Sequence, residues 1–110
     1  MGLDSYARNT DGSELTEEQE KLFDGIELCG GLFSGNGCGG SFRGKVYNRF
    51  IEDISGVSLY SEELEVCEIT RIVEALEHYK DDVLSEDDAP DLYKFFKVCD
   101  DNDLTVCGWW

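Results

Sequence analysis

The residues best suited to chemistry lie in a glycine-rich loop, residues 35–45. Within it, Gly39 is followed by four residues and then by Gly44-Lys45. This is the spacing of a phosphate-binding loop, in which backbone amides surround the phosphates and the lysine neutralises their charge. The next residue is Val46, where a magnesium-dependent loop carries Ser or Thr. Since no apolar run precedes the loop to form the required strand, nucleotide hydrolysis is not expected.

The same loop could still bind a small anion or a nucleotide without hydrolysing it. Three of the nine basic residues fall within seven positions, 43–49, at the expected start of a helix, and helix N-termini favour anions. The alternative is that these cations pair with nearby acids, because surface ion pairs are common and weak. Both interpretations stay open. The candidate ligand-binding residues are Gly39, Gly40, Arg43, Gly44 and Lys45.

No catalytic or metal-binding pattern can be assembled from the rest of the chain. The five cysteines are odd in number and never spaced Cys-x-x-Cys, so we expect reduced thiols and neither a zinc site nor a disulfide framework. A calcium loop starting at Asp101 would need Gly at its sixth position, where Val106 stands, so residues 101–103 are expected to form a turn. The single histidine, His78, leaves few possibilities for general-base catalysis. We therefore expect no catalytic residue, no metal and no cofactor.

The most unusual bulk property is the formal net charge of −16, from 25 Asp and Glu against nine Lys and Arg. This charge argues against direct binding to nucleic acid or to an anionic membrane, and it favours a basic protein partner. One specific form is an acidic face that mimics nucleic acid. Two other interpretations remain. The acids could form a solvated surface suited to a salty or crowded cell interior, or the acidity could have no function. The best functional hypothesis is a small acidic binding protein without catalytic activity, and the alternative is an anion or nucleotide pocket at loop 35–45.

Length and composition indicate a single globular domain over residues 1–110. Hydrophobic residues make up 41% of the chain, an ordinary value for a globular protein. There is no run of 18 apolar residues, and the N-terminus lacks the pattern of a signal peptide, so we expect a cytoplasmic protein. The sequence gives no prediction of oligomeric state.

Several elements must position the glycine-rich loop, and their pattern predicts an α+β fold. We expect an N-terminal strand over 3–9, a turn over 9–13 and a short helix from the capping box at Thr16 and Gln19 to about Phe23. Residues 26–29 alternate and predict a brief strand. An acidic connection is expected over 81–88 and a closing strand over 104–110. The small sheet would include strands from both termini and bury Trp109 or Trp110 against the helices.

Three longer helices are expected to pack on this sheet, near residues 44–54, 61–80 and 90–99. In the first, Val46, Phe50 and Ile54, joined by Tyr47 and Ile51, recur at helical spacing and should be buried. The second should begin at Ser61 as N-cap and end near Lys80. The expected buried stripe of the second helix is Val66, Ile69, Ile72, Val73, Leu76 and Tyr79, and that of the third is Leu92, Phe95, Phe96 and Cys99.

Short stretches along most of the chain also suggest a relationship. The chain opens with Met1-Gly2-Leu3-Asp4 and Tyr6-Ala7, and its centre contains Phe33-Ser34-Gly35-Asn36 and residues 41–47. It ends in residues 108–110, Gly-Trp-Trp. In this order of residues the chain resembles a family of small bacterial and phage proteins of unknown function. The resemblance implies a microbial or viral cytosolic setting and brings no activity or ligand with it.

Overall fold

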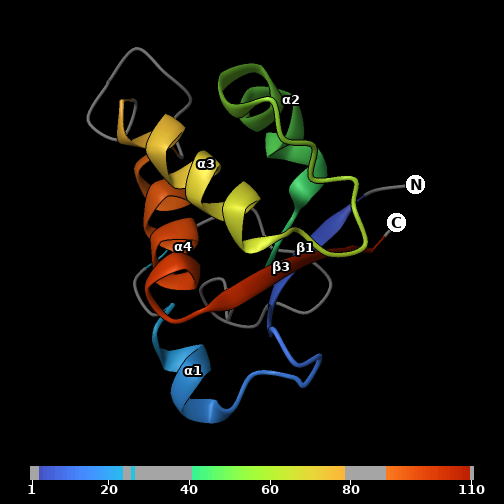
Figure 1. Cartoon of the computed structure of the whole chain (residues 1–110), viewed down its shortest axis with the longest axis vertical. Coiled ribbons are helices and arrows are strands. Elements are labelled where there is room, and N and C mark those ends of the chain that lie inside the picture. The colour runs from blue at the N-terminus through green and yellow to red at the C-terminus, as the bar shows by residue number, and fades with distance from the viewer. Residues whose placement is uncertain (1–2, 24–25, 27–40, 79–88, 110) are drawn as a thin grey trace.

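The computed structural model of the chain is an α+β domain, as the sequence predicts (Figure 1). It describes residues 3–23, 26, 41–78 and 89–109. A three-stranded antiparallel sheet has the order β2-β1-β3, with β1 (Asp4–Asn9) between β2 (Ser41–Phe42) and β3 (Leu104–Trp109). The register of β1 and β3 runs from Asp4 opposite Trp109 to Asn9 opposite Leu104. The predicted pairing of strands from both ends of the chain is confirmed, and the two termini lie close together in Figure 1.

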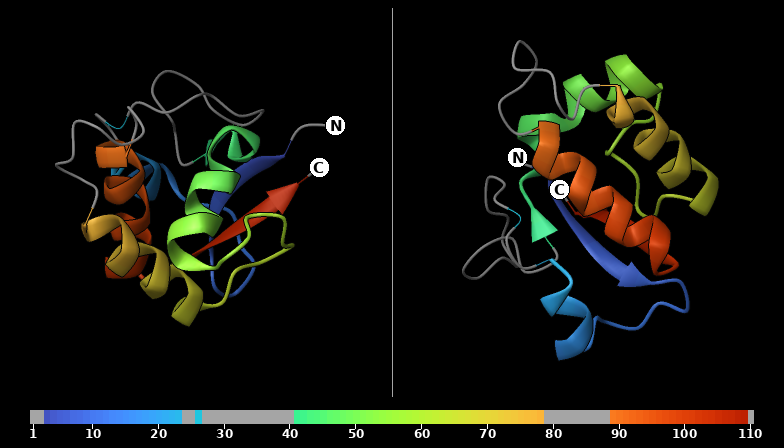
Figure 2. Two further views of the ribbon diagram at one scale, coloured as in Figure 1. Left: turned by 90° about the horizontal axis from the view of Figure 1, so that it is seen from above. Right: turned by 90° about the vertical axis from the view of Figure 1, so that its left-hand side faces the viewer.

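The α4 helix (Ala89–Asp101) supplies the centre of the core. Its predicted stripe is confirmed, since Leu92, Phe95, Phe96 and Cys99 are all fully buried. The Phe95 ring lies 4.8 Å from that of Phe42 on β2 and 4.7 Å from that of Phe23, measured between centroids. α4 packs against β3 and against α3 (Val66–Glu77), so three parts of the chain meet on these aromatic rings. Figure 2 shows the neighbouring α3 and α4 from two further sides.

The α2 helix (Gly44–Ser55) occupies the predicted residues, and its predicted apolar stripe packs on the core except at Val46. Tyr47 and Ile51 are buried together with Gly44, and Phe50 is half-buried. Val46 is 56% exposed, so its predicted burial is wrong. The cause is the contact of Gly44 with β1, which fixes the helix rotation and turns the next-but-one residue outward, because successive residues lie about 100° apart around a helix.

The α3 helix begins five residues later than predicted, at Val66 with Glu65 as N-cap. Ser61 does not cap it, because the preceding segment pairs with β3: the Leu64 amide donates to Val106 O and the Gly108 amide to Ser61 O, each at 2.9 Å. We call residues 57–64 the β3-edge segment. The helix ends at Glu77, short of the predicted Lys80.

The buried stripe of α3 departs from the prediction at its first residue. Val66 is exposed because it now occupies the first turn, at the edge of the packed region. The four central residues of the predicted stripe are buried as expected: Ile69, Ile72, Val73 and Leu76. Tyr79 lies outside the described residues.

The N-terminal turn and the short α1 helix (Glu17–Lys21) follow the prediction. The Thr16 side chain accepts a hydrogen bond from the Gln19 amide, and the Gln19 side chain accepts one from the Thr16 amide, which is the expected capping box. The Gln19 side-chain amide also pairs with that of Asn9 at the end of β1. This pair ties α1 to the sheet.

Burial was expected for Trp109 or for Trp110. Trp109 is 52% exposed, so it is not the buried one of the two. It lies opposite Asp4, and alternation along β1 puts Asp4 on the face away from the core residues Leu3 and Ala7. Three further predicted features lie outside the described residues: Trp110, the acidic connection over 81–88, and the strand over 26–29 except for Ile26. Ile26 is buried.

Candidate functional site

The predicted site residues fall into two groups. Gly39 and Gly40 lie outside the described residues, whereas Arg43, Gly44 and Lys45 form the start of α2 directly after β2. The described part of the site is therefore a helix N-terminus seated on the sheet.

Gly44 has a structural reason to be glycine. A Cβ atom at this position would lie 2.2 Å from Ser5 Oγ and 2.9 Å from Leu3 Cδ2, so the helix could not approach β1 this closely with any larger residue. The Lys45 amide donates to Leu3 O at 3.1 Å, and the Val46 amide donates to Arg43 O at 3.1 Å. Two of the amides at this helix start are therefore already hydrogen-bonded within the protein.

The two basic side chains of the candidate site differ in their surroundings. Arg43 precedes the helix in an extended conformation, and its Nη1 lies 3.9 Å from Oδ1 of Asp4. Lys45 is exposed and forms no ion pair with the residues that the structure describes. Arg43 thus has an acidic neighbour that the sequence did not suggest.

Sequence reasoning missed Asp4. Asp4 is 6% exposed, and its Oδ1 atom is buried without a hydrogen-bond partner. Burying a carboxylate without hydrogen bonds is costly, and such a residue needs an explanation. The sequence signal that could have found Asp4 is an acidic residue inside a predicted strand. In the structure its neighbours, Leu3 and Ser5, are also buried.

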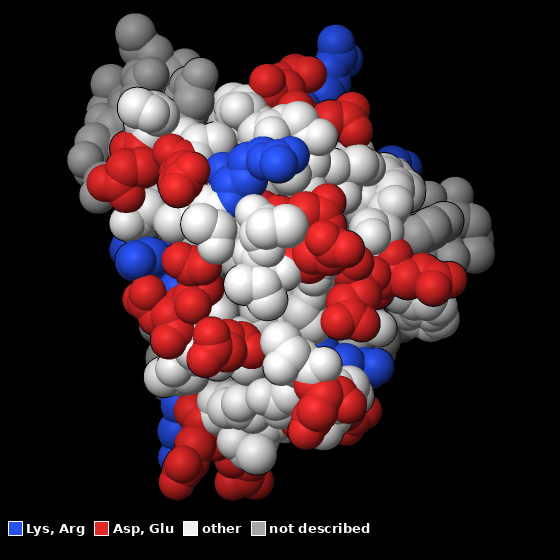
Figure 3. Space-filling model, viewed as in Figure 1, with Lys and Arg blue, Asp and Glu red and all other residues white. Residues whose placement is uncertain are grey.

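On the face shown in Figure 3, acidic side chains cover more of the surface than basic ones do. Figure 3 shows them in several groups from α1 at the lower end to α2 at the upper end, with uncharged and basic side chains between them. Within the described ranges, ion pairs hold only Asp4, Asp91 and Asp101, with Arg43, Lys94 and Lys97. Acids are also placed at the ends of the helices: α2, α3 and α4 have no basic residue in the last turn, whereas Glu52, Asp53, Glu74, Glu77, Asp100 and Asp101 all lie there.

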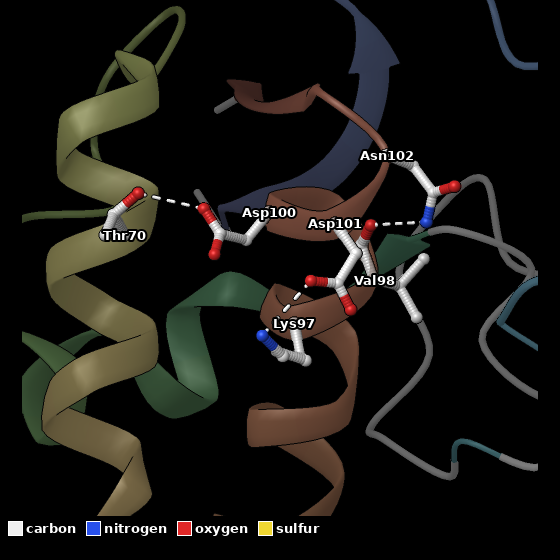
Figure 4. Close-up of polar contacts among 6 residues, drawn as sticks. All are labelled: Thr70, Lys97, Val98, Asp100, Asp101 and Asn102. Atoms are coloured by element: carbon white, nitrogen blue, oxygen red, sulfur yellow. Dashed lines mark hydrogen bonds and ion pairs between the residues drawn. The ribbon is translucent and has the colours of Figure 1, made fainter.

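The end of α4 shows how such acids are held (Figure 4). Thr70 of α3 donates a hydrogen bond from Oγ1 to Oδ1 of Asp100 at 2.8 Å, which links the two helices. Lys97 lies 3.1 Å from Asp101, and this carboxylate raises the pKa of the lysine. The helix gives way to β3 through a turn in which Asp103 has a φ of 54°. Of the turn predicted for residues 101–103, residues 102–103 are confirmed, and Asp101 is the last residue of α4.

Two further titratable groups have shifted pKa values. Burial raises the pKa of the Cys107 thiol, which favours its protonated form. Hydrogen bonds from the Ser13 hydroxyl and amide lower the pKa of the exposed Asp11 carboxyl and close the turn after β1. Within the described residues there is no group of three metal-ligating side chains and no helix long and apolar enough to cross a membrane.

No comparison with known proteins adds to this geometry. No family model, no curated protein and no solved structure matches the chain.

Proposed function

We propose that this protein is a small, non-catalytic binding module that engages a basic protein partner through its acidic surface. The observation that carries the proposal is the position of the acids at the last turns of α2, α3 and α4. The carbonyl end of a helix carries a partial negative charge, so an acid there costs about 0.3–1 kcal/mol. A cationic partner would remove this cost on binding.

The acids of α1 provide the contrast. Glu17 and Glu18 lie in the first turn, where the helix field stabilises them, and they need no partner for that purpose. If binding uses the acids in the last turns of the helices, neutralising two of them should weaken binding more than neutralising Glu17 and Glu18, although the charge removed is equal. Nucleic-acid mimicry would need two continuous rows of acids, and it stays the more specific form of the proposal.

The test is calorimetric titration with a 20-residue oligolysine peptide at physiological ionic strength. One variant combines Glu52→Gln with Asp53→Asn at the end of α2, and the matched control combines Glu17→Gln with Glu18→Gln at the start of α1. We expect the α2 variant to bind at least fivefold more weakly and to melt at a higher temperature. The α1 control should bind nearly as the parent does and melt at a lower temperature. Equal losses of affinity would show that only net charge matters, and the proposal would fail.

The second candidate is a small-anion or nucleotide site at loop 35–45. It is favoured by Lys45 at the start of α2, which is exposed and forms no ion pair with the residues that the structure describes. Ligand at a hundredfold its dissociation constant would stabilise the fold by about 2.7 kcal/mol. Lys45→Ala should abolish a rise in melting temperature with inorganic phosphate, whereas the matched charge change Arg49→Ala, on the exposed side of the same helix, should not. A parent protein whose melting temperature does not respond to millimolar phosphate would rule out the site.

A further inference from the structure

The turn between β1 and α1 has an aspartate followed by a glycine at its tip. Asp11 and Gly12 are both exposed, and Gly12 has a φ of 92° with no atom within 4 Å of the position of a Cβ. A second Asp-Gly pair, Asp24-Gly25, lies outside the described residues. The turn is separate from the acidic helix ends and from loop 35–45.

An aspartate followed by glycine is able to rearrange without an enzyme. The Gly12 backbone nitrogen attacks Cγ of Asp11; the nitrogen loses its proton and the protonated carboxyl loses hydroxide, so one water molecule leaves and a five-membered succinimide ring remains. Water then breaks one of the two ring bonds to this nitrogen. One cleavage restores aspartate, and the other gives isoaspartate, in which the backbone passes through the side-chain carbons. Glycine favours the attack because no Cβ hinders its nitrogen.

Both reacting groups form hydrogen bonds in the folded turn. The Gly12 amide donates to Asn9 O at 2.9 Å. The Asp11 Oδ1 atom accepts from the Ser13 hydroxyl at 2.6 Å and from the Ser13 amide at 2.9 Å. These two bonds favour the ionised carboxylate and lower the pKa of Asp11. Since only the protonated carboxyl readily loses hydroxide, the folded turn should slow the rearrangement.

The product would not fit the same turn, because isoaspartate adds one carbon atom to the backbone between residues 11 and 12. The turn is closed by the Asn9 amide, which donates to Ser13 O at 3.1 Å, and by the bond from the Gly12 amide. The Asn9 side chain also pairs with Gln19, which joins β1 to α1. Rearrangement should therefore loosen α1 from the sheet.

We infer that Asp11 is a modification site, where spontaneous conversion to isoaspartate is held back by the folded turn and proceeds when the turn opens. Ser13 controls the rate, because its hydroxyl and its amide both bind the carboxylate that must lose hydroxide. The product keeps one carboxylate, so the modification acts on the turn and not on the charge of the surface.

The test is incubation of the protein at 37 °C and pH 6 for several weeks, with isoaspartate at position 11 measured by peptide mapping and electron-transfer mass spectrometry. Parallel samples contain 6 M guanidinium chloride, in which the turn is unfolded. We expect the folded protein to react about tenfold more slowly than the unfolded one. In guanidinium chloride, Asp11 and Asp24 should react at similar rates, because both precede a glycine.

Matched variants show whether the turn sets the rate. Ser13→Ala removes the hydroxyl donor and keeps the amide donor, so the folded variant should react about threefold faster than the folded parent, with an unchanged rate in guanidinium chloride. Ser58→Ala is the control, since it removes a hydroxyl that accepts from the Tyr60 amide in another segment, and it should react as the parent does. Gly12→Ala, compared in guanidinium chloride, should react more slowly because its methyl group hinders the nitrogen.

Three results would each overturn the inference. Asp11 could react as fast in the folded parent as in guanidinium chloride, or Ser13→Ala and Ser58→Ala could react equally fast when folded. In the third, the isoaspartate form, separated by reversed-phase chromatography and refolded, would keep the parent NMR shifts at Asn9 and Gln19.

Discussion

The starts of α2 and α3 are built by different means. At α2, no side chain caps the helix; Gly44 is buried against Ser5 and Leu3, and the Lys45 amide bonds to Leu3 O. At α3, Glu65 and Glu68 form a reciprocal capping box on the surface. One start is therefore fixed by packing against a strand, and the other by local hydrogen bonds and charge.

This difference predicts two kinds of sensitivity. The start of α2 should respond to the volume of a side chain and little to charge, since its critical residue has no side chain. The start of α3 should respond to the loss of an acidic side chain and little to volume. Substitutions at each start, measured by urea unfolding at equilibrium, test this predicted difference.

The largest effect is expected at Gly108. This residue packs against the β3-edge segment, which precedes α3, and not against α3 itself. A Cβ atom there would lie 2.7 Å from Ser61 O and 2.8 Å from Leu59 O. These are backbone atoms of the β3-edge segment and cannot turn aside, so Gly108→Ala should lower the free energy of unfolding by about 3 kcal/mol. The approach to α3 is thus sensitive to volume even though its cap is not.

Gly56→Ala is the control for Gly108→Ala. Gly56 has a φ of 76° with no atom near its Cβ position, so Ala should cost only about 1 kcal/mol in backbone strain. A Gly108→Ala protein as stable as Gly56→Ala would show that the β3-edge segment can move away from the sheet.

The next effect is expected from Gly44→Ala, which tests the start of α2. The added methyl would meet Ser5 Oγ at 2.2 Å, but this atom can rotate, so we expect a loss of about 2 kcal/mol in unfolding free energy. Lys45→Ala, one residue along on the exposed side, should stay within about 0.5 kcal/mol of the parent. Similar values for the two variants would contradict a start fixed by packing.

At the start of α3, Glu65→Ala should cost about 1 kcal/mol, since it removes the cap from the Glu68 amide. Glu63→Ala removes the same charge from the neighbouring exposed segment without removing a cap, and it should cost nothing measurable. If the two variants unfold at the same urea concentration, the capping box does not stabilise this helix.

The same contrast explains which parts of the fold the sequence could predict. Local signals were sufficient for the Thr16–Gln19 capping box and for the apolar stripe of α4, because these depend on residues three or four apart. The start of α3 could not be placed. Ser61 is of a residue type preferred at an N-cap, whereas the helix begins after Glu65 because residues 61–64 form hydrogen bonds to β3, more than forty residues away.

The candidate site was predictable to a smaller extent. The basic residues at the start of α2 were visible as a cluster, but nothing nearby in the sequence indicates that Asp4 is the acidic neighbour of Arg43. Their contact follows from the pairing of β1 with β2, between parts of the chain that lie far apart in the sequence. The sequence left open whether Trp109 or Trp110 is buried. Trp109 lies on the predicted strand, and alternation along it puts this residue on the face away from the core.

The smallest effect among these substitutions at buried positions and caps is a gain in stability, expected from Ser5→Ala. Ser5 is fully buried beneath Gly44, and its Oγ has no hydrogen-bond partner, so the hydroxyl loses its hydration without compensation. Its removal should raise the free energy of unfolding by about 0.5 kcal/mol. The hydroxyl is also the nearest atom to a methyl group at position 44, so the two substitutions should be coupled, and Gly44→Ala should cost about 1 kcal/mol less with Ala at position 5. Additive losses in the double variant would mean that Leu3, and not Ser5, limits the approach of α2 to β1.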